Sequence, residues 1–203
     1  MGRYDSDNRD LYPGTEVLQN LLGLTDQDEL DAAEAGLVLL ATLELNAAPL
    51  PEPSDGPGFS YLLQIHNALF ADIYAWAGQT RAVDISKGGN RFANWRFISQ
   101  EGDRLAAELA AESWLAGLTV TAFASRMAYY MGELNVLHPF RDGNGRALRE
   151  YVRYLAARAG HSLTWEGVRP QEMLEASIAS YHGDTVPLAQ LLQRQIQAVQ
   201  DDG

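Results

Sequence analysis

Apolar side chains recur every three or four residues along most of this chain, which is the spacing of one helix face. The first such stretch follows Thr25, where acidic residues favour the start of a helix. Its apolar positions are Leu30, Ala33, Leu37, Leu40 and residues 43–45. We therefore predict a helix from about residue 25 to residue 45.

A second helix is predicted over residues 59–75, after a loop at 46–58 that is rich in proline and glycine. Gly78 stands in the usual position of a helix stop. The apolar stripe of this helix consists of Leu62, Ile65, Leu69 and Ile73. The same spacing predicts further helices over residues 97–115, 119–137, 143–159, 170–180 and 185–199.

Residues 81–93 break the helical pattern. Val83 and Ile85 alternate with polar neighbours, and the turn residues Lys-Gly-Gly-Asn follow at 87–90, as in a short β-hairpin. No composition shift or repeat divides the chain. The sequence therefore predicts an all-α fold: a compact helical domain over residues 25–199 with one small hairpin at about 81–93, preceded by an N-terminal extension over residues 1–24.

The composition narrows the range of partners and compartments. The 203 residues carry 15 Lys and Arg against 27 Asp and Glu, a formal net charge of −12. Such a surface repels polyanions, so we expect neither nucleic acid nor a membrane as a direct partner. The absence of cysteine excludes disulfides and thiolate catalysis. Because the chain also has no apolar run of membrane-spanning length and no signal sequence, we predict a cytoplasmic protein.

One segment, residues 138–149, combines several features that indicate chemistry. It reads His-Pro-Phe-Arg-Asp-Gly-Asn-Gly-Arg-Ala-Leu-Arg. Pro139 blocks continuation of the preceding helix, so His138 should lie where that helix ends. Gly143 and Gly145 allow a tight loop that leads into the next helix, whose unpaired N–H groups would point at an anion. The segment therefore predicts a phosphate-binding loop.

Charged side chains support this interpretation. Five of the 15 basic residues fall at positions 141, 146, 149, 153 and 158, and Arg146 and Arg149 are neighbours on one helix face. Asp142 is a hard ligand suited to Mg²⁺, and His138 is a proton acceptor suited to neutral pH. These residue types indicate phosphoryl or nucleotidyl transfer to a hydroxyl that the histidine activates. The alternative is an ordinary capped helix start with a solvated arginine face.

The segment resembles the signature of the Fic family, HxFx(D/E)GNGRxxR, with every defining position present. The likeness extends over residues 10–195 and includes Ile65-His66, Leu69-Phe70, Asp72-Ile73-Tyr74, Trp76-Ala77-Gly78 and Arg81. The resemblance implies a Fic domain that uses ATP and Mg²⁺ to attach AMP to a tyrosine, threonine or serine hydroxyl of a target protein, with release of pyrophosphate.

The resemblance also implies a role for each residue of the motif. His138 would deprotonate the target hydroxyl, Asp142 would hold the metal, and Phe140 would anchor the loop in the core. The phosphate ligands would be Gly143, Asn144 and Gly145 for the α- and β-phosphates, Arg146 for the β-phosphate and Arg149 for the γ-phosphate.

The predicted hairpin corresponds in the family to a flap that pairs with the backbone of the target as an added strand. That mode of binding suits a two-stranded ribbon with a free edge. Lys87 and Gly88 would then lie near the nucleotide. On sequence alone, an ordinary exposed hairpin with a solvated lysine is the alternative.

Members of the family are typically restrained by a glutamate that pairs with the second motif arginine, here Arg149. Residues 162–167, Ser-Leu-Thr-Trp-Glu-Gly, fit the text of the inhibitory motif, but they follow the active-site helix, so we interpret them as a loop with a strand-like turn. The resemblance then points to the short class I toxins, in which a separate small antitoxin supplies the glutamate. Relatives of that class modify the B subunit of DNA gyrase and the matching subunit of topoisomerase IV.

Two further alternatives stay open at this point. The same scaffold could transfer another group, such as UMP, phosphocholine or phosphate, because the sequence does not show which nucleotide base the site would bind. The chain could instead be an inhibited binding module or the N-terminal part of a longer secreted effector. Outside the motif, His66 is interpreted as a hydrogen-bonded histidine at the edge of the core, and no transition-metal site is expected.

Overall fold

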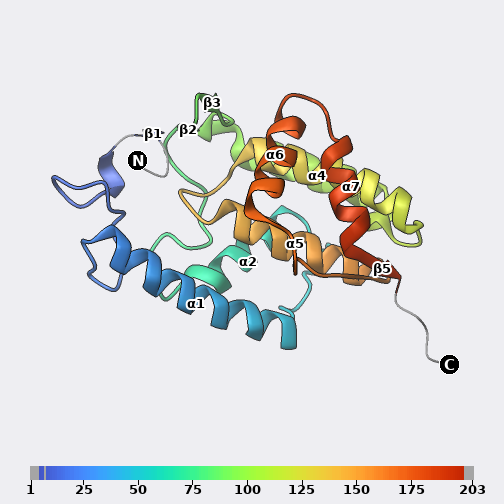
Figure 1. Cartoon of the computed structure of the whole chain (residues 1–203), viewed down its shortest axis with the longest axis horizontal. Helices are drawn as coiled ribbons and strands as arrows, with labels where there is room; N and C mark the ends of the chain where they lie inside the picture. Colours follow the sequence, from blue (N-terminus) through green and yellow to red (C-terminus); the bar gives the residue numbers. More distant parts are fainter. Residues whose placement is uncertain (1–4, 7, 199–203) are drawn as a thin grey trace.

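Helices account for most of the computed structural model, which describes residues 5, 6 and 8–198 (Figure 1). In chain order they are α1 (Gln27–Ala47), α2 (Phe59–Phe70), α3 (Ile98–Ala111), α4 (Val120–Leu137), α5 (Asn144–Arg158), α6 (Pro170–Tyr181) and α7 (Val186–Gln195). Short 3₁₀ segments lie at Asn8–Asp10, Trp95–Phe97 and Ser113–Leu115. The predicted all-α fold is confirmed. Among the described residues, no helix is both long enough and apolar enough to cross a bilayer.

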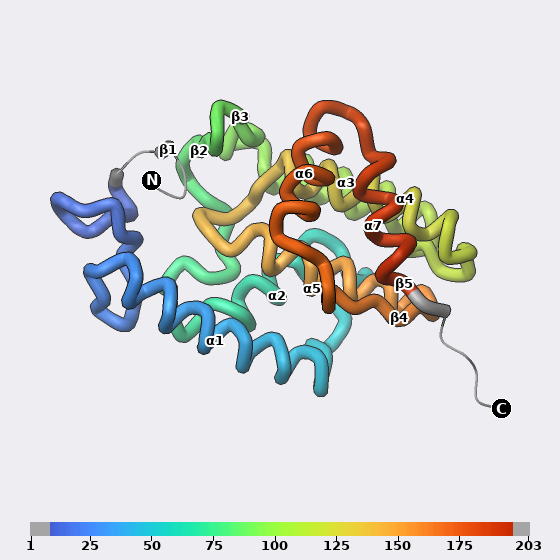
Figure 2. The backbone as a smooth tube through the Cα atoms, viewed as in Figure 1, coloured from blue at the N-terminus to red at the C-terminus, as the bar shows by residue number. Residues whose placement is uncertain are grey.

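Helix α5 packs against both α2 and α4. Helix α1 packs on α2, and α6 and α7 pack on α4, so that α1 and the α6–α7 pair lie at opposite edges of the molecule, as the tube in Figure 2 shows. The largest fully buried aromatic side chains are Tyr61, Tyr74, Tyr130, Phe70, Phe123 and Phe140. The loop that precedes α5 is therefore surrounded by elements from distant parts of the chain.

The predicted hairpin consists of strands β2 (Ile85–Lys87) and β3 (Asn90–Arg91). Gly88 and Gly89 both have positive φ, 58° and 83°, which suits the two central residues of a tight hairpin turn. The ribbon is not two-stranded, however. Strand β1 (Asp5–Ser6) pairs antiparallel with β2 on the side away from β3. The edge of β2 that we expected to be free is therefore occupied by the start of the same chain.

A second antiparallel sheet joins β4 (His161–Leu163) to β5 (Ile196–Ala198). The strand-like interpretation of residues 162–167 is confirmed for Ser162 and Leu163, and the strand begins one residue earlier, at His161. The predicted helix over 185–199 is too long, because α7 ends at Gln195 and the chain continues as β5. Residue 199 lies outside the described residues.

Helix α2 ends at Phe70 and not at residue 75 as predicted. After Phe70 the chain turns more tightly, with the N–H of Ile73 bonded to the Phe70 carbonyl three residues before it, and the Ile73 carbonyl accepts the N–H of Leu21 at 2.8 Å. The chain continues in turns through the Trp-Ala-Gly segment. Ile73 still reaches the core and is fully buried.

Helix α1 begins where predicted, with the Asp26 side chain accepting the N–H groups of Asp28 and Glu29 at its N-terminus. Its buried face differs from the predicted one. Leu40 and Leu43 are 59% and 56% exposed, and the buried residues are Leu30, Glu34, Val38 and Leu45. A carboxylate thus lies in the middle of the stripe that contacts the rest of the protein.

Candidate active site

The loop between α4 and α5 takes its shape from two residues with left-handed backbone angles. His138 directly follows α4 with φ 46°, so the helix ends where Pro139 predicts. Gly143 caps the start of α5 with φ 77°, and a Cβ atom there would come within 2.5 Å of the Phe70 ring. Glycine alone satisfies both the backbone angle and this close approach. The loop is therefore packed directly against α2.

Asn144 closes the loop on itself. Its side chain accepts a hydrogen bond from the N–H of Phe140 and donates one to the Phe140 carbonyl, both at 2.8 Å. The Phe140 ring is 1% exposed and fixes the loop to the core. Because the Asn144 side chain is used within the loop, its predicted contact with phosphate rests on its backbone N–H.

The His138 side chain is held by a backbone carbonyl and an aromatic ring. Its Nδ1 lies 2.9 Å from the carbonyl oxygen of Asn135, and its ring stacks on Phe92 at 3.7 Å between centroids. Since a carbonyl only accepts hydrogen bonds, Nδ1 carries the proton and Nε2 has the lone pair. Burial, together with the positive charges of Arg81 and Lys87, lowers the pKa of His138 to about 4. The ring is therefore neutral at pH 7, with Nε2 as its proton acceptor.

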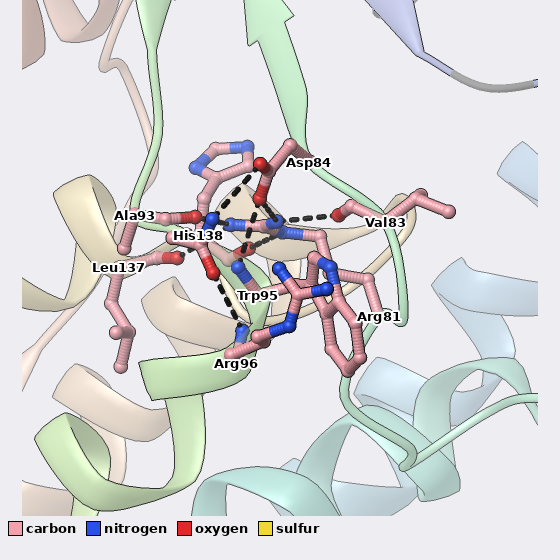
Figure 3. A network of polar contacts seen from close by, with 9 residues as sticks. Arg81, Val83, Asp84, Ala93, Trp95, Arg96, Leu137 and His138 are labelled. Carbon is pink, nitrogen blue, oxygen red and sulfur yellow. Dashed lines mark hydrogen bonds and ion pairs between the residues drawn. The ribbon is translucent and has the colours of Figure 1, made fainter.

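Arg81 joins the base of the flap to the His138 loop (Figure 3). Its side chain is fully buried. Its guanidinium donates to the backbone carbonyls of His138 at 2.8 Å, Val83 at 2.6 Å, Ala93 at 2.5 Å and Leu137 at 3.3 Å. A planar group with five donors suits a place where several carbonyls converge. We did not predict Arg81 as a site residue, and its position after the Trp-Ala-Gly segment was the only signal.

His66 links α2 to the loop. Its Nδ1 accepts the N–H of Gly78 at 2.9 Å, so Nε2 carries the proton and donates to the Asp142 carbonyl, 3.0 Å away. The ring stacks on Phe140 at 3.7 Å, and burial lowers the pKa of His66 to about 4. The neutral ring keeps both hydrogen bonds at pH 7. The interpretation of His66 as a hydrogen-bonded histidine is confirmed, although it is fully buried and not at the edge.

The first turn of α5 has the properties of an anion site. The N–H groups of Asn144 and Gly145 open the helix, where no intrahelical acceptor exists for them. The Arg149 guanidinium lies beside Gly145, 3.5 Å from where a Cβ would be. Burial and the nearby charge of Arg146 lower the pKa of Arg149, and no carboxylate pairs with it in the part of the chain that the structure describes. A desolvated cation beside a helix N-terminus favours an anion such as phosphate.

The five arginines between residues 141 and 158 do not gather in one cluster. Four of them pair with carboxylates: Arg141 with Asp10 at 3.1 Å, Arg146 with Glu34 at 2.7 Å, Arg153 with Glu150 at 2.8 Å and Arg158 with Glu52 at 2.9 Å. Arg146 and Arg149 remain at the start of α5.

Asp142 is the carboxylate of the loop. Its Oδ1 accepts the N–H of Gly143 at 2.5 Å and lies 3.6 Å from Nη2 of Arg146. The described residues contain no group of three or more side chains that could hold a metal ion together. One carboxylate next to a phosphate site nevertheless fits Mg²⁺, since this ion binds one or two protein carboxylates and completes its coordination with substrate phosphates and water.

The flap residues and the inhibitor-like segment approach the loop in different ways. Lys87 and Gly88 lie at the exposed tip of the hairpin, and Lys87 is close enough to influence the pKa of His138.

Residues 162–167, which fit the text of the inhibitory motif, contact the backbone of α5. Nε1 of Trp165 donates to the carbonyl of Arg149 at 3.1 Å. Glu166 is exposed, and its N–H donates to Thr164 Oγ1. The segment thus meets the backbone of α5, and Glu166 does not pair with the Arg149 guanidinium.

A small cavity of about 40 Å³ lies next to this arginine, between α4, α5 and α6. Its lining includes Asn135, Gly145, Arg149 and Ser180. The hydroxyl of Ser180 is buried and has no hydrogen-bond partner within the described residues. Arg149 therefore borders a mostly apolar cavity with a few polar groups, as well as the start of α5.

Comparison with known proteins relates the chain to one family. Residues 58–156 match the model of the Fic/DOC family. The chain is 41% identical over 198 residues to "Protein adenylyltransferase VbhT" of Bartonella schoenbuchensis, covering 97% of this chain but 41% of that protein. It is 37% identical over 186 residues to "Probable protein adenylyltransferase Fic" of Salmonella typhimurium, covering 92% of this chain and 90% of that one. The chain thus spans less than half of the first relative and most of the second.

The fold is similar to a solved structure as well. The BepC protein of Bartonella tribocorum, a VirB-translocated effector solved with bound AMPPNP, superposes with a TM-score of 0.87 at 28% identity. The match covers 95% of this chain and 98% of that one. It therefore includes α1 and the C-terminal helices in addition to the segment that carries the motif.

Proposed function

The chain belongs to the Fic/DOC family and is a protein adenylyltransferase, and from this premise we propose that His138 activates a target hydroxyl for attack on ATP. The observation that carries the proposal is one continuous segment that holds a neutral histidine, with its lone pair on Nε2, at the end of α4 and a desolvated arginine beside the N-terminus of α5. The AMPPNP in the related BepC structure, an ATP analogue, supports ATP as the nucleotide.

The proposed step replaces one bond of the α-phosphorus by another and transfers one proton. Nε2 of His138 takes the proton of a tyrosine, threonine or serine hydroxyl, and the hydroxyl oxygen attacks the α-phosphorus. The bond between the α-phosphorus and the oxygen that bridges to the β-phosphate breaks, and pyrophosphate leaves. The products are an AMP ester on the target protein and a protonated His138, which returns its proton to solvent.

The α5 N-terminus and its two arginines would bind the triphosphate. Gly143, Asn144 and Gly145 would bind the α- and β-phosphates, with Arg146 on the β-phosphate and Arg149 on the γ-phosphate. The donors to phosphate would be the N–H groups of Asn144 and Gly145, because the Gly143 N–H donates to Asp142. Fixed donors of this kind stabilise the negative charge that develops on the leaving pyrophosphate.

We propose Asp142 as the protein ligand of a Mg²⁺ ion that enters with ATP. When bound, the ion would neutralise phosphate charge and orient the triphosphate. The hydrogen bond from the Gly143 N–H holds the Asp142 carboxylate in place beside the phosphate site. Phe140 would anchor the loop from the core side, where its ring contacts His66.

Labelled nucleotides test the proposed reaction against transfer of another group. With ATP labelled at the α-phosphate, a bacterial lysate should contain a protein band that becomes labelled only when the chain is added. ATP labelled at the γ-phosphate should give no band that depends on the added chain. Label from the γ-position would indicate phosphate transfer, and stronger labelling from α-labelled UTP would indicate UMP transfer. The mass of the modified peptide would reveal phosphocholine.

We propose that the target docks at the flap, with Lys87 and Gly88 next to the nucleotide, and that the protein acts in the cytoplasm. As specific targets we propose the B subunit of DNA gyrase and the matching subunit of topoisomerase IV. Growth arrest on expression would be the expected result of such modification. Identification of the labelled band by mass spectrometry decides between these targets and others.

We further propose that the chain is the toxin of a toxin–antitoxin pair. A small antitoxin would insert a glutamate against Arg149, the desolvated guanidinium at the start of α5. Because this carboxylate would compete with the γ-phosphate, purification together with the product of a neighbouring gene should lower AMP transfer by at least about tenfold, as expected when one strong charge pair is blocked. Equal transfer with and without that product would remove the antitoxin proposal.

A further inference from the structure

A buried carboxylate on α1 contacts the first arginine after the loop. Glu34 is 1% exposed and lies outside residues 58–156, which match the family model. Its Oε1 is 2.7 Å from Nη1 of Arg146, and its Oε2 accepts a hydrogen bond from the Tyr74 hydroxyl at 2.5 Å. These contacts join α1 to the first turn of α5, which carries the phosphate site.

The position of Glu34 on its helix is otherwise apolar. Leu30 and Val38, one turn before and one turn after it, belong to the same buried stripe. Burying a carboxylate has a desolvation cost that its ion pair scarcely offsets, and an apolar residue of similar size often stabilises a fold as well or better. A contribution to stability therefore does not explain why a glutamate lies here.

Arg146 is held from three directions. Nη1 meets Glu34, Nη2 lies 3.6 Å from Asp142, and the guanidinium carbon is 4.7 Å from the centre of the Phe70 ring. The Arg146 side chain is 28% exposed, so part of the guanidinium stays accessible to a ligand. A guanidinium that is oriented before a ligand arrives loses little side-chain freedom on binding, which strengthens binding.

We propose that Glu34 is a positioning residue that fixes the guanidinium of Arg146 for the β-phosphate of the bound nucleotide. The proposal rests on the proposed function, which assigns the β-phosphate to Arg146. Glu34 does not touch the nucleotide in this account, and Tyr74 orients the Glu34 carboxylate through its hydroxyl. It follows that Glu34 contributes to the affinity for nucleotides that have a β-phosphate and not to the affinity for AMP.

Titration calorimetry with ATP, ADP and AMP tests this difference. In the Glu34→Gln variant, the Kd of ATP and of ADP should rise about tenfold to a hundredfold, the range for loss of one charge-assisted hydrogen bond, and the Kd of AMP should change less than about twofold. The Tyr74→Phe variant should show a smaller rise with the same preference. Glu34→Asp, which keeps the charge, should recover part of the lost ATP affinity.

Glu44→Gln is the matched control, because it removes the same charge from an exposed position of the same helix. It should leave all three affinities unchanged. An equal loss of affinity for ATP, ADP and AMP in Glu34→Gln would assign Glu34 to the fold alone and overturn the proposal. Unchanged or tighter ATP binding would overturn it too.

Two further outcomes separate this inference from the function on which it rests. If Glu34→Gln does not fold, Tyr74→Phe removes only one hydroxyl and provides the same comparison between nucleotides. If the unaltered chain binds no ATP, the proposed function itself is rejected. If the unaltered chain binds ATP and neither variant discriminates between ATP and AMP, the role of Glu34 alone is rejected.

Discussion

Replacement of His138 by alanine is expected to lower the rate of AMP transfer by about 10²–10⁴-fold, the usual contribution of a general base, and the fold should remain intact. The reason is that the proposed mechanism makes Nε2 the proton acceptor and assigns the phosphates to α5. ATP binding should therefore persist in the variant. Initial rates with α-labelled ATP, together with calorimetric ATP binding, measure both effects.

The backbone at His138 calls for a second variant. Alanine in the left-handed region, φ 46° here, costs about 1–2 kcal/mol, whereas asparagine tolerates it. His138→Asn should therefore lose transfer with less loss of stability. The control is His161→Asn, since His161 is buried on β4, where its Nε2 hydrogen-bonds the Leu118 carbonyl. Retained transfer in both His138 variants would reject the histidine as base.

His138 also predicts the direction in which the rate of AMP transfer changes with pH. Burial lowers the pKa of His138 to about 4, so the ring of the free enzyme is protonated, and inactive as a base, only below that pH. The value of kcat/KM should fall as the pH drops through about 4, because this parameter reports the free enzyme. Bound triphosphate places negative charge near the ring and raises its pKa, so the acid limb of kcat should lie at higher pH.

Replacement of Arg81 by alanine is expected to destabilise the protein by about 3–5 kcal/mol, because it removes the donor from a buried hydrogen-bond network. Without the guanidinium, the carbonyls of His138, Val83, Ala93 and Leu137 lose a common partner. Any folded variant should also transfer AMP poorly, since the loop and the flap would then be joined by backbone hydrogen bonds, from Arg81 to Pro139 and from Ala93 to Val136, without those of the guanidinium. Chemical denaturation measures the first effect and labelled ATP the second.

Two comparisons identify the cause of that loss. Arg81→Lys keeps the charge but replaces a planar fork by a single ammonium group, so it should recover little. Arg104→Ala removes an exposed arginine that pairs with Glu101 and Glu108 on α3, and it should cost less than about 1 kcal/mol. Similar losses for Arg81→Ala and Arg104→Ala would contradict the structural role of Arg81.

Local sequence signals suffice for much of the architecture. Helical spacing predicts the bounds of α4, α5 and α6 to within one or two residues. The reason is that residues at or next to the helix ends, such as Pro139 and Pro170, determine where these helices stop or start. The Gly88–Gly89 turn predicts the hairpin for the same reason. The loop between α4 and α5 is one continuous segment, so its proline and glycines predict its backbone conformation without knowledge of the rest of the fold.

Features that depend on contacts between residues far apart in the chain could not be predicted from the sequence. Glu34 interrupts an apolar stripe, so the sequence alone predicts an exposed position there. Its burial is explained only by its contacts with Arg146 and Tyr74. Arg81 acts through backbone carbonyls, which have no sequence signature. Helix α1 has leucines on several sides, so periodicity did not reveal that Leu40 and Leu43 face outward. Beyond the end of helix α2, the Ile73 carbonyl bonds to Leu21, a distant residue that the spacing of apolar residues does not reveal.

The pairing of β1 with β2 has a practical consequence for work with this protein. Along its outer side, β2 is already paired with residues 5 and 6 of β1. A target peptide that binds there as an added strand must therefore first displace β1. An affinity tag at the N-terminus would be separated from β1 by only four residues of sequence. Strand β5 lies at the far end of the molecule (Figure 1), so a tag at the C-terminus is the safer choice when rates are measured.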